Sequence, residues 1–142
     1  WVFFLSCAAW SCLDEPDCYG LNNNIVGITF KSAGTFATVT VDSLTVTSDA
    51  ALLQLVSNSS TGKVYLPLNY FSDTTSYRFE TPDTAYVLTL GHKSQSQFVS
   101  SRCGQRFVLA NLAVLEHTFD SVRLVSATPG SRPDVSNLEV FW

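Results

Sequence analysis

The stretch of sequence that decides the fold is residues 77–91, which read Tyr-Arg-Phe-Glu-Thr-Pro-Asp-Thr-Ala-Tyr-Val-Leu-Thr-Leu-Gly. Tyr77 and Phe79 alternate with charged residues, and the alternation resumes at Tyr86, Leu88 and Leu90. A period of two is typical of strands that bury one face, because successive side chains of a strand point to opposite sides of the sheet. Two strands are therefore predicted here, and Gly91 is expected to close the second.

The same alternation recurs along the rest of the chain. Between residues 37 and 46 its phase slips by one position at Asp42-Ser43, which predicts a bulge or a tight turn. Residues 58–62 are expected to form a turn that ends the preceding run. About nine short strands with regular turn signals predict an all-β fold, an antiparallel β-sandwich of immunoglobulin-like or related type. The further runs are 26–30, 37–46, 53–55, 64–66, 98–109, 122–124 and 138–142.

One segment fits a second pattern. Leu112, Leu115, Phe119 and Val122 also match the apolar stripe of an amphipathic helix. A short helix near residues 111–117 is therefore an alternative to a strand.

Composition narrows the class of protein. The chain has 142 residues, enough for one domain, and its 46% hydrophobic and 14% charged residues exclude an intrinsically disordered chain. The net charge of −4, from 12 acidic and 8 basic residues, argues against a nucleic-acid partner, because phosphate contacts need clustered Lys and Arg. The sequence contains no apolar run long enough for a membrane-spanning helix.

The first residues resemble a targeting segment. Nine of residues 1–11 are apolar and none is charged, as in the hydrophobic region of a signal peptide whose start is missing. The character changes to acidic directly after Cys12, which predicts a lipoprotein signal with Cys12 as the lipidated residue. Cys7 is a rival acceptor, and a buried first strand with ordinary core cysteines is the alternative. We expect a signal segment at 1–11, a lipid-anchored tether at 12–23 and one β-sandwich domain at 24–142.

The four cysteines are consistent with this organisation. If Cys7 leaves with the signal and Cys12 carries lipid, Cys18 and Cys103 remain as an even pair in an oxidising compartment. A Cys18–Cys103 disulfide is therefore predicted. The cysteine spacings do not match zinc ligands, and His92 and His117 stand alone, so no metal and no cofactor is expected.

Several motifs carry a family resemblance. Phe98-Val-Ser-Ser-Arg-Cys-Gly104, the Cys-x5-Cys of Cys12 and Cys18, and Leu66-Pro-Leu-Asn69 resemble small uncharacterised Bacteroidetes-type lipoproteins, grouped as a domain of unknown function. The resemblance implies a lipid-anchored, extracytoplasmic β domain with Cys18 and Cys103 paired, and it implies no activity.

A second motif resembles the general O-glycosylation acceptor of the same bacterial group. The motif consists of Asp, then Ser or Thr, then a third residue that is small, aliphatic or Thr. It occurs four times in the chain, so four residues are candidates for glycosylation. Ordinary turn formation by Asp, Ser and Thr explains the same pattern. The four candidates are Ser43, Thr74, Thr84 and Ser121.

No catalytic constellation is evident. The sequence has no Gly-x-Ser-x-Gly motif and no glycine-rich phosphate loop, and His92 is expected in an exposed turn after Gly91. We therefore expect a non-catalytic outer-membrane lipoprotein, on the cell surface or the periplasmic face, that docks as an accessory component on a larger membrane complex. The alternative is a surface module that binds glycans or other ligands through aromatic residues. That alternative would be favoured by three or more aromatics on one exposed face, with these candidates: Tyr65, Tyr70, Phe71, Tyr77 and Tyr86.

Overall fold

A computed structural model describes residues 23–48, 54–130 and 132–142 of the chain. Within these residues the secondary structure is entirely β and includes no helix, so none could span a membrane. The all-β prediction is confirmed. The strands are β1 (Ile25–Lys31), β2 (Val41–Ser48), β3 (Gln54–Thr61), β4 (Lys63–Pro67), β5 (Thr74–Glu80), β6 (Ala85–Ser100), β7 (Gly104–His117), β8 (Ser121–Leu124) and β9 (Leu138–Phe141).

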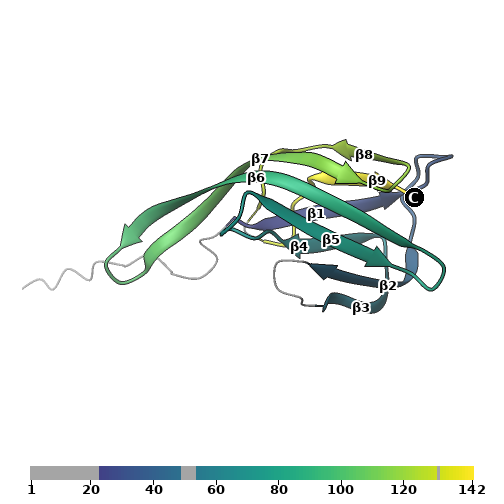
Figure 1. Cartoon of the computed structure of the whole chain (residues 1–142), viewed down its shortest axis with the longest axis horizontal. Helices are drawn as coiled ribbons and strands as arrows, with labels where there is room; N and C mark the ends of the chain where they lie inside the picture. The colour runs from purple at the N-terminus through teal and green to yellow at the C-terminus, as the bar shows by residue number, and fades with distance from the viewer. Residues whose placement is uncertain (1–22, 49–53, 131) are drawn as a thin grey trace, which may run out of the picture.

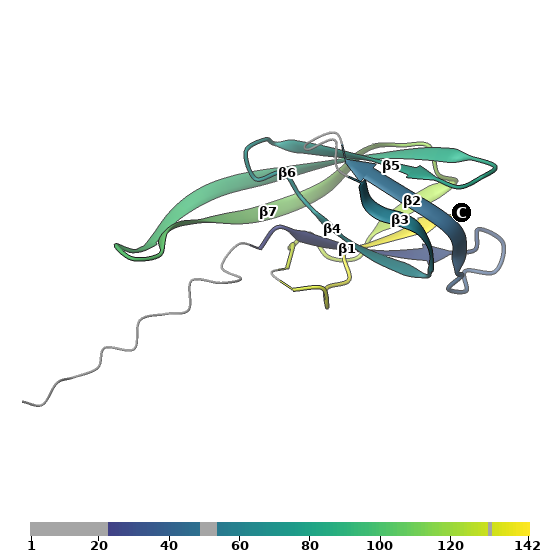
Figure 2. The same ribbon diagram turned by 90° about the horizontal axis from the view of Figure 1, so that it is seen from below.

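The strands form two sheets packed as a sandwich (Figures 1 and 2). One sheet has the order β4-β1-β9-β8 and the other the order β3-β2-β5-β6-β7. All adjacent pairs are antiparallel except β1 and β9, which pair in parallel with Ile28 opposite Leu138. The predicted sandwich is confirmed. It contains one parallel pair, which the alternation of apolar residues within single strands does not predict.

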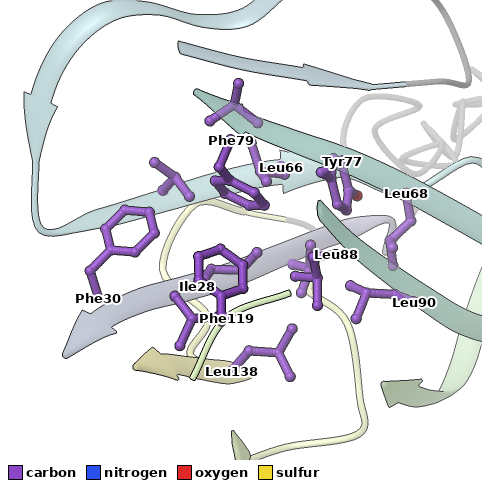
Figure 3. Close-up of a cluster of buried hydrophobic side chains, with 14 of the residues drawn as sticks. Ile28, Phe30, Leu66, Leu68, Tyr77, Phe79, Leu88, Leu90, Phe119 and Leu138 are labelled. Carbon is purple, nitrogen blue, oxygen red and sulfur yellow. The ribbon is translucent and has the colours of Figure 1, made fainter. Parts of the chain in front are cut away.

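The core lies between the two sheets (Figure 3). β1 contributes Ile28 and Phe30 from one layer, and β5 contributes Tyr77 and Phe79 from the other, all fully or almost fully buried. The rings of Phe30 and Phe79 meet edge to face, with centroids 6.2 Å apart, and so join the layers directly. The predicted alternation therefore does place the apolar residues of these strands inside.

The bulge predicted in β2 is present. The pairing of β2 with β3 shifts register between Val41 and Leu44, and Ser43 has a positive φ of 52°. The turn predicted at 58–62 is wrong in extent, because β3 continues to Thr61 and only Gly62 separates it from β4. Pairing with β2 keeps this polar segment extended.

The alternative of a helix near residues 111–117 is wrong. These residues belong to β7, where Ala113 pairs with Gly91 and Val114 with Leu90 of β6. Register shifts on either side of these pairs, together with a positive φ of 55° at Asn111, break the period of two. The four apolar residues do not share one face, because Leu112 is buried, Leu115 is 57% exposed, and Phe119 and Val122 lie beyond the end of β7.

The two longest strands form an arm that projects from the sandwich. β6 was expected to end at Gly91, but it continues to Ser100, because Gly91 is paired on both sides, with Thr74 of β5 and Ala113 of β7. Beyond this point the described parts of β6 and β7 pair only with each other, down to a turn at residues 101–103. We call residues 93–110 the β6–β7 arm, and Figures 1 and 2 show it extending away from both sheets.

Candidate ligand pocket at the root of the arm

The loop between β4 and β5 packs against the root of the β6–β7 arm. Asn69 holds the loop in shape, because its backbone N–H donates to Thr75 Oγ1 at 2.9 Å and its side-chain oxygen accepts from the Phe71 N–H at 3.0 Å. Ser94 on β6 donates its hydroxyl to the Tyr70 carbonyl at 2.7 Å. These bonds place two consecutive aromatic residues, Tyr70 and Phe71, beside the arm.

Three aromatic rings meet there. Tyr70 stacks on Phe107 of β7 with centroids 4.5 Å apart and ring planes inclined by 21°. Phe71 contacts both rings, at 4.6 Å from Tyr70 and 5.4 Å from Phe107. Tyr70 and Phe107 are half-buried, whereas Phe71 is 79% exposed. The cluster therefore closes the root of the arm and still presents a large apolar side chain to solvent.

Polar groups surround these rings in an open pocket of about 420 Å³. Ser94, Ser96 and Asp73 supply two hydroxyls and one carboxylate, and Ser96 pairs directly with Phe107 across the strands. The lining is completed by the three aromatics and Ser72. An apolar surface edged by a few hydroxyl and carboxylate groups is suited to binding a small polar ligand with apolar faces.

His92 lies buried next to this pocket. The expectation of an exposed turn is wrong: the residue is 4% exposed in the middle of β6, and its backbone N–H donates to the Asp73 carbonyl at 2.9 Å. Its Nε2 lies 2.9 Å from Thr75 Oγ1, whereas its Nδ1 is buried and has no hydrogen-bond partner in the part of the chain described. Burial lowers the pKa of His92 below 6.5, and the nearby charge of Asp73 partly opposes this by raising it.

The buried histidine predicts a pH dependence of stability. The folded protein binds the proton less readily than the unfolded chain, so the free energy of unfolding falls as the pH drops from about 6.5 toward the lower folded pKa. Denaturant titrations between pH 7.5 and 5.5 should show this loss in the wild type and a smaller one in a His92→Gln variant. Asp73→Asn should extend the loss to lower pH, because the group that raises the pKa is gone. If the free energy of unfolding of His92→Gln fell with pH as steeply as that of the wild type, His92 would not be the group responsible.

The structure describes only part of the predicted cysteine set. Cys7, Cys12 and Cys18 lie outside the described residues. Cys103 lies in the turn at the tip of the arm, where its N–H donates to Ser100 Oγ at 3.0 Å. Its pairing with Cys18 stays a prediction.

The four O-glycosylation candidates are spread over the domain. Thr74 and Ser121 are exposed at the first positions of β5 and β8, and Thr84 is exposed in the turn before β6. Ser43 lines a second pocket, of about 350 Å³, together with Asp42 and Asp83. Glycosylation of these residues stays a prediction.

The aromatic candidates divide into three groups. Tyr77 is 1% exposed, and Tyr86 is half-buried and stacks on Phe119 at 4.8 Å. Tyr65 is partly exposed beneath Lys63. Of these candidates, Tyr70 and Phe71 belong to one surface cluster. The third ring of the cluster, Phe107, was not recognised from the sequence, because more than thirty residues separate it from the loop that it contacts.

Two further titratable groups have structural partners. His117 Nδ1 lies 3.1 Å from the Phe119 carbonyl, and Glu139 pairs with Arg123 at 2.6 Å. Among residues 23–48, 54–130 and 132–142, His, Cys, Asp and Glu form no group of three or more that could hold a metal ion.

Together these features define a β-sandwich domain with a projecting two-stranded arm and an aromatic surface pocket at its root. The chain belongs to the Family of unknown function (DUF6452), whose model matches residues 35–142 and so covers β2 to β9 with both the arm and the pocket. No curated protein and no solved structure matches the chain. The predicted membership of an uncharacterised family is confirmed, and the lipoprotein and Bacteroidetes assignments stay predictions.

Proposed function

We propose that this protein is a non-catalytic binding module of the outer membrane, and that its pocket at the root of the arm takes a glycan. The observation that carries the proposal is the cluster of Tyr70, Phe71 and Phe107, three aromatics on one face with Phe71 79% exposed. Phe71 forms a continuous aromatic surface with the half-buried rings of Tyr70 and Phe107, and a contiguous apolar patch is more informative about binding than a single exposed ring.

The lining of the pocket suits a sugar. The apolar C–H face of a pyranose can stack on the exposed ring of Phe71, and its hydroxyls can donate to Asp73 and exchange hydrogen bonds with Ser96. Ser94 already donates to the Tyr70 carbonyl, so its role is to hold the loop. The open shape of the pocket fits a short, surface-bound saccharide.

Replacing Phe71 by alanine is expected to weaken binding at least about tenfold, because a buried aromatic contact contributes on the order of 1.5–3 kcal/mol. NMR titrations with a panel of neutral and amino-sugar disaccharides would measure this, and shifts should concentrate on residues 70–73 and 94–96. Phe36→Ala is the matched control, since Phe36 is 68% exposed and does not line the pocket. Equal binding by both variants would count against the site.

The proposal includes the lipid anchor. In this proposal Cys12 is the lipidated residue after a signal segment at 1–11, and Cys18 pairs with Cys103, which the even number of cysteines left after processing supports. Mass spectrometry of the mature N-terminal peptide tests the anchor, and an unmodified peptide containing residues 1–11 would refute it. Protease treatment of intact cells separates a cell-surface location from a periplasmic one.

A second candidate function is that of an accessory component docked on a larger membrane protein complex. The observation that favours it is the β6–β7 arm, whose outer part extends outside the sandwich (Figure 2). Purification from native outer membranes would test this, because a stable complex should co-purify with the wild type and not with a chain whose arm is shortened.

A further inference from the structure

The β6–β7 arm differs in charge from the rest of the chain. Residues 93–110 contain three of the eight basic residues, Lys93, Arg102 and Arg106, and none of the twelve acidic ones. The arm therefore carries +3, whereas the remaining residues, with five basic and twelve acidic side chains, carry −7. The arm is therefore the most basic part of the described domain.

The tip of the arm combines this charge with an exposed aromatic ring. Phe98 is 72% exposed and lies three residues before the turn, and Arg102 is exposed within the turn. Arg106 lies on the opposite face from Phe98, because it pairs with Gln97, whose side-chain oxygen it contacts at 2.9 Å. The tip thus presents an apolar side chain on one face, a cationic side chain on the opposite face and a second cationic side chain in the turn.

We propose that the tip of the β6–β7 arm binds the surface of a bilayer that contains anionic lipids, with Phe98 entering the headgroup region and Arg102 and Arg106 facing lipid phosphates. Aromatic side chains with neighbouring Lys and Arg are the combination that holds proteins at membrane interfaces. The arm is the part of the described domain that reaches furthest from the sandwich, so it can touch a bilayer without burying either sheet (Figures 1 and 2).

The choice of a bilayer over an acidic protein rests in part on the proposed lipid anchor. If Cys12 carries lipid and Cys18 pairs with Cys103, six residue steps separate the anchored residue from the tip of the arm. Six residues span at most about 20 Å. The anchor would therefore keep Cys103 within that distance of the membrane surface, plus the about 6 Å that separate the Cα atoms of a disulfide. Phe98 lies close to Cys103 at the same end of the arm.

The test is binding of the whole 142-residue chain, disulfide intact, to vesicles of phosphatidylcholine with and without 30% phosphatidylglycerol (about one lipid in three, an anionic surface). The wild type should prefer the anionic vesicles, and the preference should fall in high salt. An Arg102→Gln, Arg106→Gln double variant should bind them about 25-fold more weakly, at about fivefold for each basic residue. Phe98→Ser should reduce binding to both vesicles about tenfold.

Matched controls are Phe36→Ala and Arg132→Gln, an exposed aromatic and an exposed cation that lie outside the arm. Hydrogen exchange of the bound protein should show protection concentrated on residues 96–106. Two results would overturn the proposal: equal binding of the wild type to neutral and anionic vesicles, or arm variants that lose no more vesicle binding than the controls. Either result would favour an acidic protein as the partner of the arm. The vesicle result does not depend on lipidation, so failure of the arm proposal is distinguishable from failure of the Cys12 anchor, which mass spectrometry decides separately.

Discussion

Replacing Asn137 by alanine is expected to lower the free energy of unfolding by about 3 kcal/mol or more, because it leaves several buried polar groups without partners. Asn137 is fully buried, and its side-chain oxygen accepts from the Gly27 N–H at 3.0 Å. Its side-chain amide donates to the carbonyls of Ser126 and Thr128 at 3.0 and 2.8 Å. One side chain therefore fixes the β8–β9 connection against β1.

Urea unfolding followed by tryptophan fluorescence would measure this loss. Asn24→Ala is the matched control: Asn24 is half-buried and its side chain makes one long bond, 3.3 Å, to the Leu68 carbonyl. The control should lose less than about 1 kcal/mol. A comparable loss of free energy of unfolding in both variants would show that the buried hydrogen bonds of Asn137 do not stabilise the fold more than the single bond of Asn24.

Replacing Gly27 by alanine is expected to destabilise the fold by about 3 kcal/mol, at the upper end for an overpacked site. A Cβ at this position would lie 2.0 Å from the backbone oxygen of Val135, so backbone rather than a flexible side chain would have to move. Part of the β8–β9 connection thus crosses directly over β1, on the face away from the core.

Gly34→Ala provides the comparison, since an added Cβ there would meet no atom within 4 Å. Its stability should stay within about 0.5 kcal/mol of the wild type. Thermal and urea unfolding of the two variants would measure the difference, and a Gly27→Ala variant as stable as Gly34→Ala would contradict the close approach.

Local alternation predicted the parts of the fold in which one face of a strand is buried. Ile28, Phe79 and Leu88 stand at alternating positions, and all three are fully buried. The irregularity at Ser43 was predicted as a bulge or a tight turn, because a phase slip moves side chains to the opposite face, and the structure shows the bulge. Pairing partners were not predictable, since the parallel contact of β1 with β9 joins the two ends of the domain.

The pocket could be predicted only in part. Tyr70 and Phe71 were recognised as candidates from their residue type, but Phe107 joins them only because the loop after β4 folds against β7. His92 was expected at the surface after a glycine, whereas pairing of Gly91 on both sides carries the strand onward and buries the ring. The sequence around Gly91 does not show whether this glycine turns the chain or lies within a strand. In the structure it lies within β6, where the absence of a side chain lets Leu115 pack closely.

The sequence by itself determined the all-β class, the inward face of most strands and the absence of acidic residues from positions 93–110, because these depend on residue type and spacing alone. Only the tertiary structure decided that those positions form a projecting arm, that three aromatics share one surface, and that Asn137 joins the β8–β9 connection to β1. The physical reason is that hydrogen bonds and ring contacts between distant segments arise only when both sheets are assembled, whereas the burial preference of each side chain is present in the chain from the start.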